Sequence, residues 1–373
     1  MARKPLGVLV VEDSPTVRRF LRERIEAEPD LYVAGEAGDG ASGVELVARL
    51  HPDVIVIDIR MPRLDGVELT RRVMATQPTP ILVFCARSDQ DGVQRGFEAL
   101  QAGAMALIEK PHPGRGASPA DVGQELVAKL RVLAGVRAVT RRAAGRGASP
   151  GGAPPAERPT SPSPAISSPS PGPPLAVLGG RVDCVAIGAS TGGPAATLEL
   201  LRGLPADLAA PVLVAQHMTP GFMGELARWL DRESALGVGI ATGGERPQPG
   251  RVYLAPDDQS LSLSAEGALV CDGRPAEARL RPSVDLLFRS VAERCGSRAL
   301  GVLLSGMGQD GVEGLRELYR RGGLAFAQDP TTCVVASMPQ SAIEGGFVSE
   351  VLAPAAMGPR ILRLVGTRRL PGP

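Results

Sequence analysis

The chain has 373 residues, 43% of them hydrophobic, and its 41 basic and 40 acidic side chains leave a formal net charge of +1. This length predicts two domains, and the balanced charge argues against a basic surface that binds nucleic acid. Five scattered cysteines, none in C-x-x-C spacing, argue against a disulfide framework or a zinc site and indicate a reducing compartment. No apolar run approaches the ~20 residues of a membrane span, so we expect a monomeric cytoplasmic protein without membrane insertion.

A stretch rich in Pro, Ser, Gly and Ala, residues 147–174, divides the chain. It lacks the large apolar side chains that offset the entropy lost on ordering, which predicts a disordered, semi-extended linker. The predicted organisation is therefore a first domain at residues 1–142, a linker at 143–176 and a second domain at 177–373.

In the first domain, apolar runs alternate with amphipathic stretches, which is typical of a parallel α/β fold. We expect a first helix at 17–28, a last helix around 122–133, and five strands at residues 6–11, 32–37, 54–59, 80–85 and 106–110. The size and the alternation predict a flavodoxin-like domain.

Charged side chains follow three of these strands. Glu12 and Asp13 end the first, Asp58 ends the third, and Lys110 ends the fifth. We expect the three strand ends to lie side by side at the carboxyl edge of the sheet, where ligands of such folds bind. Three carboxylates and a lysine are suited to Mg²⁺ and to accepting a phosphoryl group, because the cation neutralises charge on the transferring oxygens. The alternative is that acidic residues merely favour loop ends, and the joint pattern argues against it.

Residues 5–135, including the motif IVIDIRMPRLDG, closely resemble a response-regulator receiver domain. The resemblance implies that Asp58 is the phosphoacceptor and that Glu12 and Asp13 are its acidic pair. It further implies that Lys110, which precedes a proline, pairs with the phosphoryl group.

The same resemblance implies a Mg²⁺ site formed by Asp13, Asp58 and the carbonyl of Arg60. Two positions depart from the receiver pattern. Cys85 stands in the phosphorylation pocket where the pattern has Thr or Ser, and Leu107 stands where it usually has Tyr or Phe.

The second domain also alternates strands and helices. We expect a helix at 195–204, a hairpin at 261–270, and strands at residues 182–188, 211–216, 251–256, 299–304 and 324–328. This pattern predicts a second parallel-sheet α/β domain.

Ser190 lies in the sequence GASTGG, directly after a predicted strand and before a predicted helix. Such a G-x-S-x-G turn can expose a serine nucleophile, and the same glycine-rich turn can cradle a phosphate at a helix N-terminus. The pentapeptide alone does not choose between these two functions.

A serine nucleophile needs a base, and the chain has three histidines. His51 and His112 belong to the first domain, whereas His217 ends a strand of the second domain. His217 is therefore the candidate base for Ser190.

The base needs an orienting carboxylate, and the available aspartates are Asp257, Asp258, Asp285, Asp310 and Asp329. Asp310 is favoured because it follows a strand, in a glycine-rich loop whose N–H groups could approach an oxyanion. Asp285 lies in a predicted helix, where we expect it to cap the helix or face solvent. The order Ser, His, Asp differs from that of the α/β-hydrolases.

Residues 182–352 strongly resemble the catalytic domain of the chemotaxis protein-glutamate methylesterase (CheB) family. The shared motifs, in order, are IGASTGGP, QHM, YLAPDDQSL, RPSVDLLF, SGMGQDG, AQDPTTCVVASMPQSAI and GFVSEVL. The resemblance implies hydrolysis of glutamate γ-methyl esters, and deamidation of glutamines, on methyl-accepting chemotaxis receptors. It also implies a chemotaxis histidine kinase as phosphodonor, and a receiver that covers the active-site cleft until it is phosphorylated.

The resemblance implies residue roles as well. Ser190 would be the nucleophile, His217 the general base and Asp310 its orienting partner. The Met307 backbone N–H would contribute to the oxyanion hole, and Thr191 would support the histidine.

Two other functions agree less well with the sequence. A receiver joined to a nucleotide-binding module would need a Walker-type GK[ST], or a G-x-G-x-x-G with a ribose-binding acid, and the sequence contains neither. A binding-only regulator with a vestigial triad is disfavoured by the complete set of triad residues.

Overall fold

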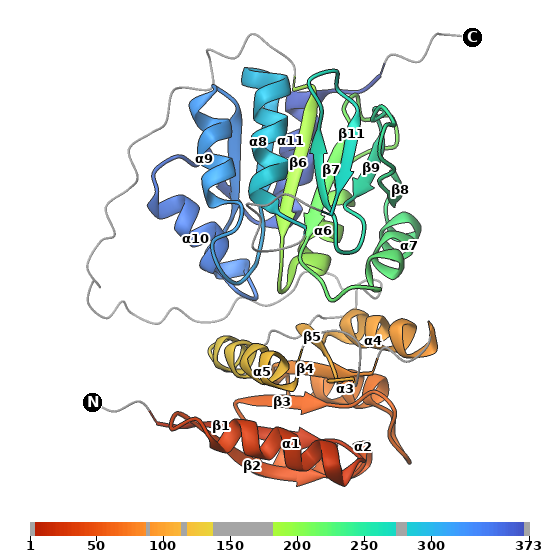
Figure 1. Ribbon diagram of the computed structural model, residues 1–373, viewed down its shortest axis with the longest axis vertical. Coiled ribbons are helices and arrows are strands. Elements are labelled where there is room, and N and C mark those ends of the chain that lie inside the picture. Colours follow the sequence, from red (N-terminus) through yellow and green to blue (C-terminus); the bar gives the residue numbers. More distant parts are fainter. Residues whose placement is uncertain (1–3, 87–89, 113–117, 137–181, 274–281, 369–373) are drawn as a thin grey trace, which may run out of the picture.

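The computed structural model describes residues 4–86, 90–112, 118–136, 182–273 and 282–368. Two α/β domains lie end to end, with the N-terminal domain at one end of the long axis (Figure 1). The predicted domain boundaries at 142/143 and 176/177, and the predicted linker between them, fall outside the described residues.

The N-terminal domain is built on a five-stranded parallel sheet with strand order β2-β1-β3-β4-β5. Its strands are β1 (Leu6–Val11), β2 (Leu31–Ala37), β3 (Val54–Ile57), β4 (Ile81–Cys85) and β5 (Ala106–Glu109). Its helices are α1 (Pro15–Glu26), α2 (Gly40–Leu50), α3 (Gly66–Thr76), α4 (Gln90–Ala102) and α5 (Pro119–Ala134). Apolar residues of α1 and α5 pack on one face of the sheet, and those of α2, α3 and α4 on the other. This confirms the predicted flavodoxin-like fold and all five predicted strands.

One topological prediction was wrong. The ends of β1, β3 and β5 do not form three neighbouring edges, because β4 lies between β3 and β5. The order brings Cys85, the last residue of β4, between the strand that precedes Asp58 and the strand that precedes Lys110.

The C-terminal domain is built on a seven-stranded parallel sheet with order β14-β13-β12-β6-β7-β9-β8. Its strands are β6 (Cys184–Ala189), β7 (Val212–Gln216), β8 (Gly237–Ile240), β9 (Arg251–Leu254), β12 (Ala299–Leu303), β13 (Leu324–Gln328) and β14 (Glu350–Leu352). The predicted hairpin is confirmed as an antiparallel pair, β10 (Ser260–Leu263) and β11 (Leu269–Asp272).

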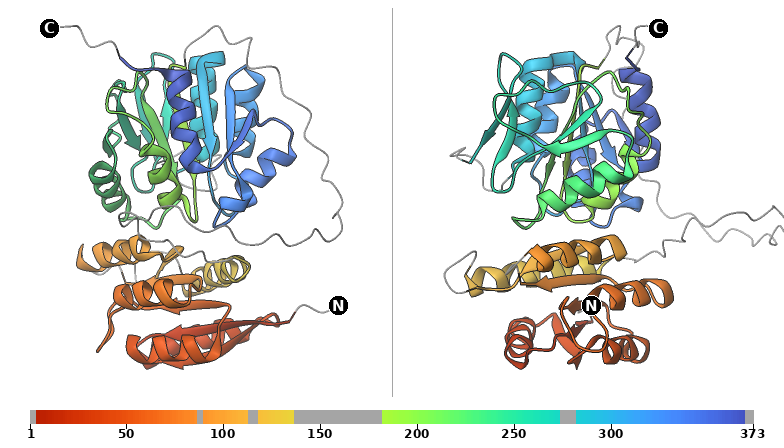
Figure 2. Two further views of the ribbon diagram at one scale, coloured as in Figure 1. Left: turned by 180° about the vertical axis from the view of Figure 1, so that it is seen from behind. Right: turned by 90° about the vertical axis from the view of Figure 1, so that its right-hand side faces the viewer.

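Helices cover both faces of this sheet, as the front and rear views show (Figures 1 and 2). On one face lie α8 (Val284–Cys295), α9 (Val312–Arg320) and α10 (Ser337–Glu344). On the other lie α6 (Gly193–Leu201), α7 (Met223–Glu233) and α11 (Pro354–Val365). None of the helices in the described parts of the chain combines the length and the apolarity that crossing a bilayer requires.

The two edge strands, β8 and β14, were not predicted. β8 has the sequence GVGI and is half-exposed, and β14 is three residues long. Short edge strands that bury little surface lack the continuous apolar run that marks the central strands.

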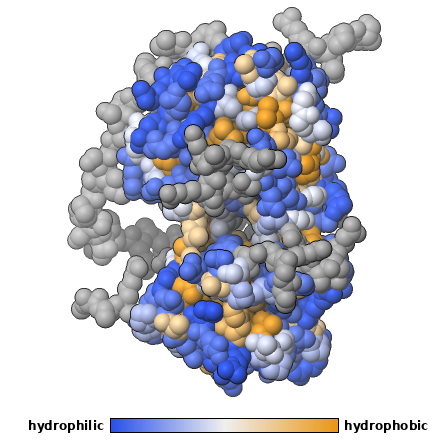
Figure 3. Space-filling model, in the orientation of Figure 1, coloured by the Kyte–Doolittle hydropathy of each residue, from blue (hydrophilic) through white to orange (hydrophobic). Residues whose placement is uncertain are grey.

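The two domains share an apolar interface. The rings of Phe97, on α4, and Trp229, on α7, make an edge contact with centroids 5.5 Å apart. Phe222 of the C-terminal domain is fully buried, and a Cβ added to Gly96 would lie 3.0 Å from its ring. One core cluster contains residues of both domains, although the surface narrows between them (Figure 3). The glycine therefore allows a close approach of α4 to the C-terminal domain.

Candidate active site

Three adjacent strands position the candidate triad. Ser190 follows β6, His217 follows β7, and Asp310 lies in the loop that follows β12. Because β12, β6 and β7 are neighbours in a parallel sheet, the three residues meet at one carboxyl edge. After β6 the chain enters α6 on one face of the sheet, and after the neighbouring strand β12 it enters α9 on the other face. Open α/β sheets bind ligands at such a point.

The turn after β6 presents Ser190. The Ser190 N–H donates to the carbonyl of Ser305 (3.0 Å), and the Gly193 N–H donates back to the carbonyl of Ser190 (2.8 Å). Gly192 has φ +80°, in the left-handed region, and a side chain there would also collide with Val334. The sharp turn therefore depends on glycine at this position.

His217 is held by both its backbone and its ring. Its N–H donates to the carbonyl of Ala189 (2.8 Å), and its ring Nε2 donates to Asp310 Oδ2 (2.8 Å). The other ring nitrogen, Nδ1, is thereby left for the proton of Ser190. Among the described residues no hydrogen bond joins the Ser190 hydroxyl to the ring, as is common for nucleophile and base before substrate binds.

Asp310 is mostly buried and reaches the N-terminus of α8. Besides His217, it accepts the N–H groups of Val284 (2.8 Å) and Asp285 (3.0 Å). Burial by itself raises the pKa of Asp310, but the hydrogen bond and charge of His217, with these N–H groups, outweigh it and lower the pKa. The carboxylate thus stays ionised beside the imidazole.

Two backbone N–H groups that line the cleft have no acceptor among the described residues. The Gly306 N–H donates to the Val335 carbonyl, and the Gly308 N–H donates to the Ser337 hydroxyl (3.1 Å). The Met307 N–H between them has no acceptor within the described parts of the chain, and neither has the Thr191 N–H. Both residues line the same cleft as Ser190. The role of the Met307 N–H as an oxyanion donor stays a prediction.

The contacts of Thr191 do not test its predicted role. No hydrogen bond between the Thr191 side chain and His217 occurs among the residues that the structure describes, so its support of the histidine remains a prediction. The Thr191 carbonyl instead accepts from the Ser305 hydroxyl (2.7 Å). Its free N–H directly follows the nucleophile, where hydrolases often place an oxyanion donor.

Gln216 was not predicted as a site residue. Its buried carboxamide donates to the carbonyls of Ser190 (2.8 Å) and His217 (2.9 Å), which joins the two turns that carry these residues. A polar residue ending an otherwise apolar strand was the only signal for it in the sequence.

The acidic pocket of the N-terminal domain has the predicted composition. Ligand atoms of Glu12, Asp13 and Asp58 all lie within 4.8 Å of one another. The Lys110 ammonium lies 2.8 Å from Glu12 Oε2 and 3.0 Å from Asp58 Oδ1. A cavity of about 300 Å³ beside them is lined by Asp13, Asp58, Ile59, Arg60, Cys85, Ala86, Gly92 and Lys110. Converging carboxylates in a small cavity fit a hard divalent cation.

Burial perturbs two groups in this pocket. It raises the pKa of Glu12 to about 7, with the charge of Asp58 adding to the effect and Lys110 opposing it. It also raises the pKa of the Cys85 thiol to about 12, again with a contribution from Asp58. Cys85 is therefore a neutral thiol, and a bound cation would favour the ionised form of Glu12.

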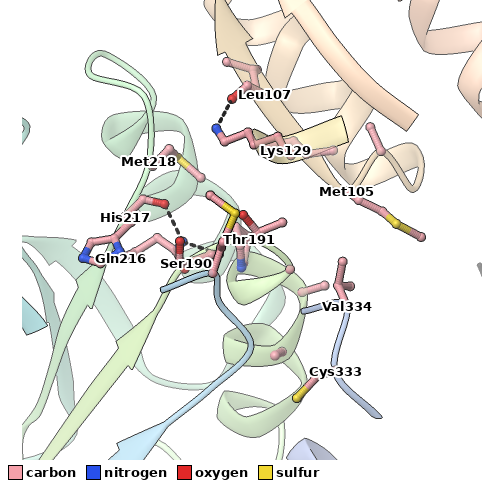
Figure 4. A pocket seen from close by; sticks show the side chains of 18 of the residues that line it. Met105, Leu107, Lys129, Ser190, Thr191, Gln216, His217, Met218, Cys333 and Val334 are labelled. Carbon is pink, nitrogen blue, oxygen red and sulfur yellow. Dashed lines mark hydrogen bonds between the residues drawn. The ribbon is translucent and has the colours of Figure 1, made fainter. Parts of the chain in front are cut away.

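The triad opens into a cleft between the domains. Its volume is about 1240 Å³, and the facing residues include Leu107, Lys110, Lys129, Ser190, His217 and Met307. Leu107 and Lys129 of the N-terminal domain lie across the cleft from Ser190 and His217 (Figure 4). The Thr219 hydroxyl donates to the Leu107 carbonyl (3.5 Å), which also accepts from Lys129 (3.0 Å). The N-terminal domain thus covers the mouth of the site.

Comparison with known proteins agrees with this architecture. The CheB methylesterase family model matches residues 185–361, and the response regulator receiver domain model matches residues 8–115. Protein-glutamate methylesterase/protein-glutamine glutaminase 4 of Myxococcus xanthus is 44% identical over 358 residues, 95% of each chain. Protein-glutamate methylesterase/protein-glutamine glutaminase 3 of Anaeromyxobacter dehalogenans is 42% identical over 362 residues, 95% of this chain and 98% of the relative.

Among solved structures, the CheB methylesterase catalytic domain of Thermotoga maritima is 39% identical and has a TM-score of 0.48, covering 50% of this chain and 100% of that one. The near-complete coverage by the relatives means that both domains and their order are shared with them. The chain therefore belongs to the CheB methylesterase family and carries a response-regulator receiver domain ahead of its methylesterase domain.

Proposed function

We propose that this protein hydrolyses glutamate γ-methyl esters on methyl-accepting chemotaxis receptors, and deamidates receptor glutamines, under control of phosphorylation at Asp58. The observation that carries the proposal is the His217–Asp310 hydrogen bond beside Ser190, at the ends of adjacent strands. The test is methanol release from methylated receptor. A purified protein that released none, with or without a phosphodonor, would contradict the proposal.

In the first step His217 Nδ1 takes the proton of Ser190 as Oγ attacks the ester carbonyl carbon. The resulting oxyanion accepts the Met307 N–H and the Thr191 N–H, which stabilise the charge where it develops. The intermediate collapses as the imidazolium gives its proton to the leaving methoxide, which departs as methanol. Asp310 stabilises the imidazolium and fixes the ring tautomer throughout.

In the second step His217 removes a proton from water, which attacks the acyl-enzyme and releases the receptor glutamate with Ser190 restored. A glutamine side chain passes through the same acyl-enzyme, with ammonia leaving in place of methanol. A substrate side chain on a receptor helix requires an open approach, so the receiver domain has to move away from the cleft.

The receiver domain supplies the control. Asp58 would accept a phosphoryl group from a chemotaxis histidine kinase, and Asp13, Asp58 and the Arg60 carbonyl would hold Mg²⁺. When bound, the cation neutralises charge on the transferring oxygens. Lys110 lines both the acidic pocket and the interdomain cleft. This position supports a direct effect of phosphorylation on the contact between the receiver domain and the methylesterase domain. A new charge at Asp58 would change the ion pairs of Lys110 at that boundary.

Replacement of Asp58 with alanine is expected to abolish the rise in methanol release that a small phosphodonor causes in the wild type. The phosphoacceptor is lost, so no acyl phosphate forms to weaken the interface. Chelation of divalent cations with EDTA should have the same effect on the wild type.

The matched control is Asp30→Ala. Asp30 directly precedes β2, so it lies at the amino edge of the sheet, whereas Asp58 lies at the carboxyl edge. Asp30→Ala should respond to the phosphodonor like the wild type. If Asp58→Ala were still stimulated, the proposed phosphorylation site would be wrong.

Gly96→Val is expected to raise methanol release by the unphosphorylated protein about tenfold. An added Cβ would lie 3.0 Å from Phe222 across the interface and 3.0 Å from Leu107 Cδ1 of the same domain, and overpacking of this kind costs about 1–3 kcal/mol. The contact with Leu107 is present in both states, whereas the contact with Phe222 exists only in the covered state, so the Phe222 part of the penalty shifts the population toward the open one.

Gln94→Val, at an exposed position on the same helix, is the control and should leave the unphosphorylated rate unchanged. A Gly96→Val protein that is folded and no faster than the wild type would argue against inhibition by this interface.

A further inference from the structure

Two aspartates in the methylesterase domain, Asp285 and Asp310, bind the N-termini of two neighbouring helices. Asp310 binds the start of α8, which contains Asp285, and Asp285 binds the start of α9, which follows Asp310 in the chain. Asp310 immediately precedes α9, yet its carboxylate accepts N–H groups of Val284 and Asp285 at the start of α8. Asp285 lies in the first turn of α8, yet its carboxylate accepts N–H groups at the start of α9. Each carboxylate therefore lies near the N-terminus of one of two packed helices, where the helix dipole is positive.

The contacts of Asp285 fall on the backbone directly after Asp310. Asp285 Oδ1 accepts the N–H of Gly311 (3.0 Å) and the N–H of Gly314 (2.7 Å). The first of these N–H groups belongs to the peptide that joins Asp310 to Gly311. A hydrogen bond at that peptide fixes the direction from which the Asp310 side chain leaves the backbone.

We propose that Asp285 is a positioning residue for catalysis, which holds the peptide after Asp310 so that the Asp310 carboxylate faces His217. This inference rests on the proposed function, because the role of Asp310 does. The prediction that Asp285 caps its own helix or faces solvent was wrong, because Ser283 caps α8 and the Asp285 carboxylate binds the start of the neighbouring helix α9.

Hydrogen bonds offset part of the cost of burying the Asp285 carboxylate. Burial raises its pKa, and the charge of Asp310 adds to that effect, whereas the Gly314 and Gly311 N–H groups and Arg289 oppose it. A buried acid beside a second acid is unfavourable unless its hydrogen bonds are made. The two hydrogen bonds of Asp285 are made to backbone N–H groups, one in the loop that contains Asp310 and one in α9.

The test compares Asp285→Ala with Asp285→Asn. Both hydrogen bonds use the single atom Oδ1, so asparagine can keep them while it removes the charge. We expect Asp285→Ala to lower kcat about 10- to 100-fold with KM within twofold, because small displacements of catalytic groups have effects of this size. Asp285→Asn should stay within threefold of the wild type. The control Glu313→Ala removes an exposed acid from the first turn of α9 and should match the wild type.

A second measurement does not depend on activity. The chain has three histidines, so with ¹⁵N-labelled histidine the His217 ring N–H bound to Asp310 can be assigned by its loss in His217→Gln. We expect this signal to be lost or shifted in Asp285→Ala and kept in Asp285→Asn. If Asp285→Ala does not fold, Asp285→Glu displaces the acceptor and should change both the signal and kcat.

An Asp285→Ala protein with wild-type kcat, or with lower kcat and an unchanged ring signal, would overturn the positioning role. The positioning role would also be overturned if Asp285→Asn lowered kcat as much as Asp285→Ala. A wild-type protein that releases no methanol would instead overturn the proposed function, and the ring signal would still report whether Asp285 positions Asp310.

Discussion

Methanol release from methylated receptor is expected to fall by about 10⁶-fold when Ser190 is replaced by alanine. Without Oγ no acyl-enzyme forms, and His217 has no serine proton to accept. Loss of the nucleophile in serine hydrolases has effects of this order, because triad members act as a unit. The remaining rate would come from the oxyanion N–H groups and substrate binding alone.

Two controls make this result specific to the nucleophile. Ser297→Ala, at an exposed position before the amino end of β12, lies at the sheet edge opposite to the site and should release methanol at the wild-type rate. Phosphorylation of Asp58 in Ser190→Ala should be unchanged, because the acidic pocket belongs to the other domain. Equal rates of methanol release in Ser190→Ala and wild type would remove the esterase assignment.

Asp310→Asn is expected to lower kcat by about 10⁴-fold, since an amide at the orienting position of such a triad favours the wrong histidine tautomer. Here the backbone adds a second reason. Oδ2 accepts from His217 and from the Val284 N–H, while Oδ1 accepts from the Asp285 N–H. The single oxygen of asparagine cannot occupy both places, so its NH₂ group must face a hydrogen-bond donor.

Asp329→Asn is the informative comparison, because Asp329 was another candidate for the orienting acid. Its carboxylate accepts the N–H (2.9 Å) and hydroxyl (2.8 Å) of Thr331 and makes no contact with His217. We expect Asp329→Asn to keep kcat within about threefold of the wild type. A large loss there together with a small one in Asp310→Asn would reverse the assignment of the orienting acid.

The sequence by itself determined the two-domain α/β organisation, the central strands and the candidate residues of both sites. Long apolar runs such as those of β1, β6 and β12 are buried on both faces, so their composition identifies them without the rest of the chain. Motifs around Ser190, His217 and Asp58 carry chemistry in few residues, and the scarcity of histidine singled out His217.

Strand order and side-chain direction were decided only by the tertiary structure, because they depend on contacts between segments far apart in the chain. β4 enters between β3 and β5, so the ends of β1, β3 and β5 are not neighbours, and Cys85 lines the acidic pocket between Asp58 and Lys110. Gln216 ties two turns together through carbonyls that no local pattern reveals. Asp285 looked like an ordinary helical residue, and only the packing of α8 against α9 directs its carboxylate to the backbone beside Asp310.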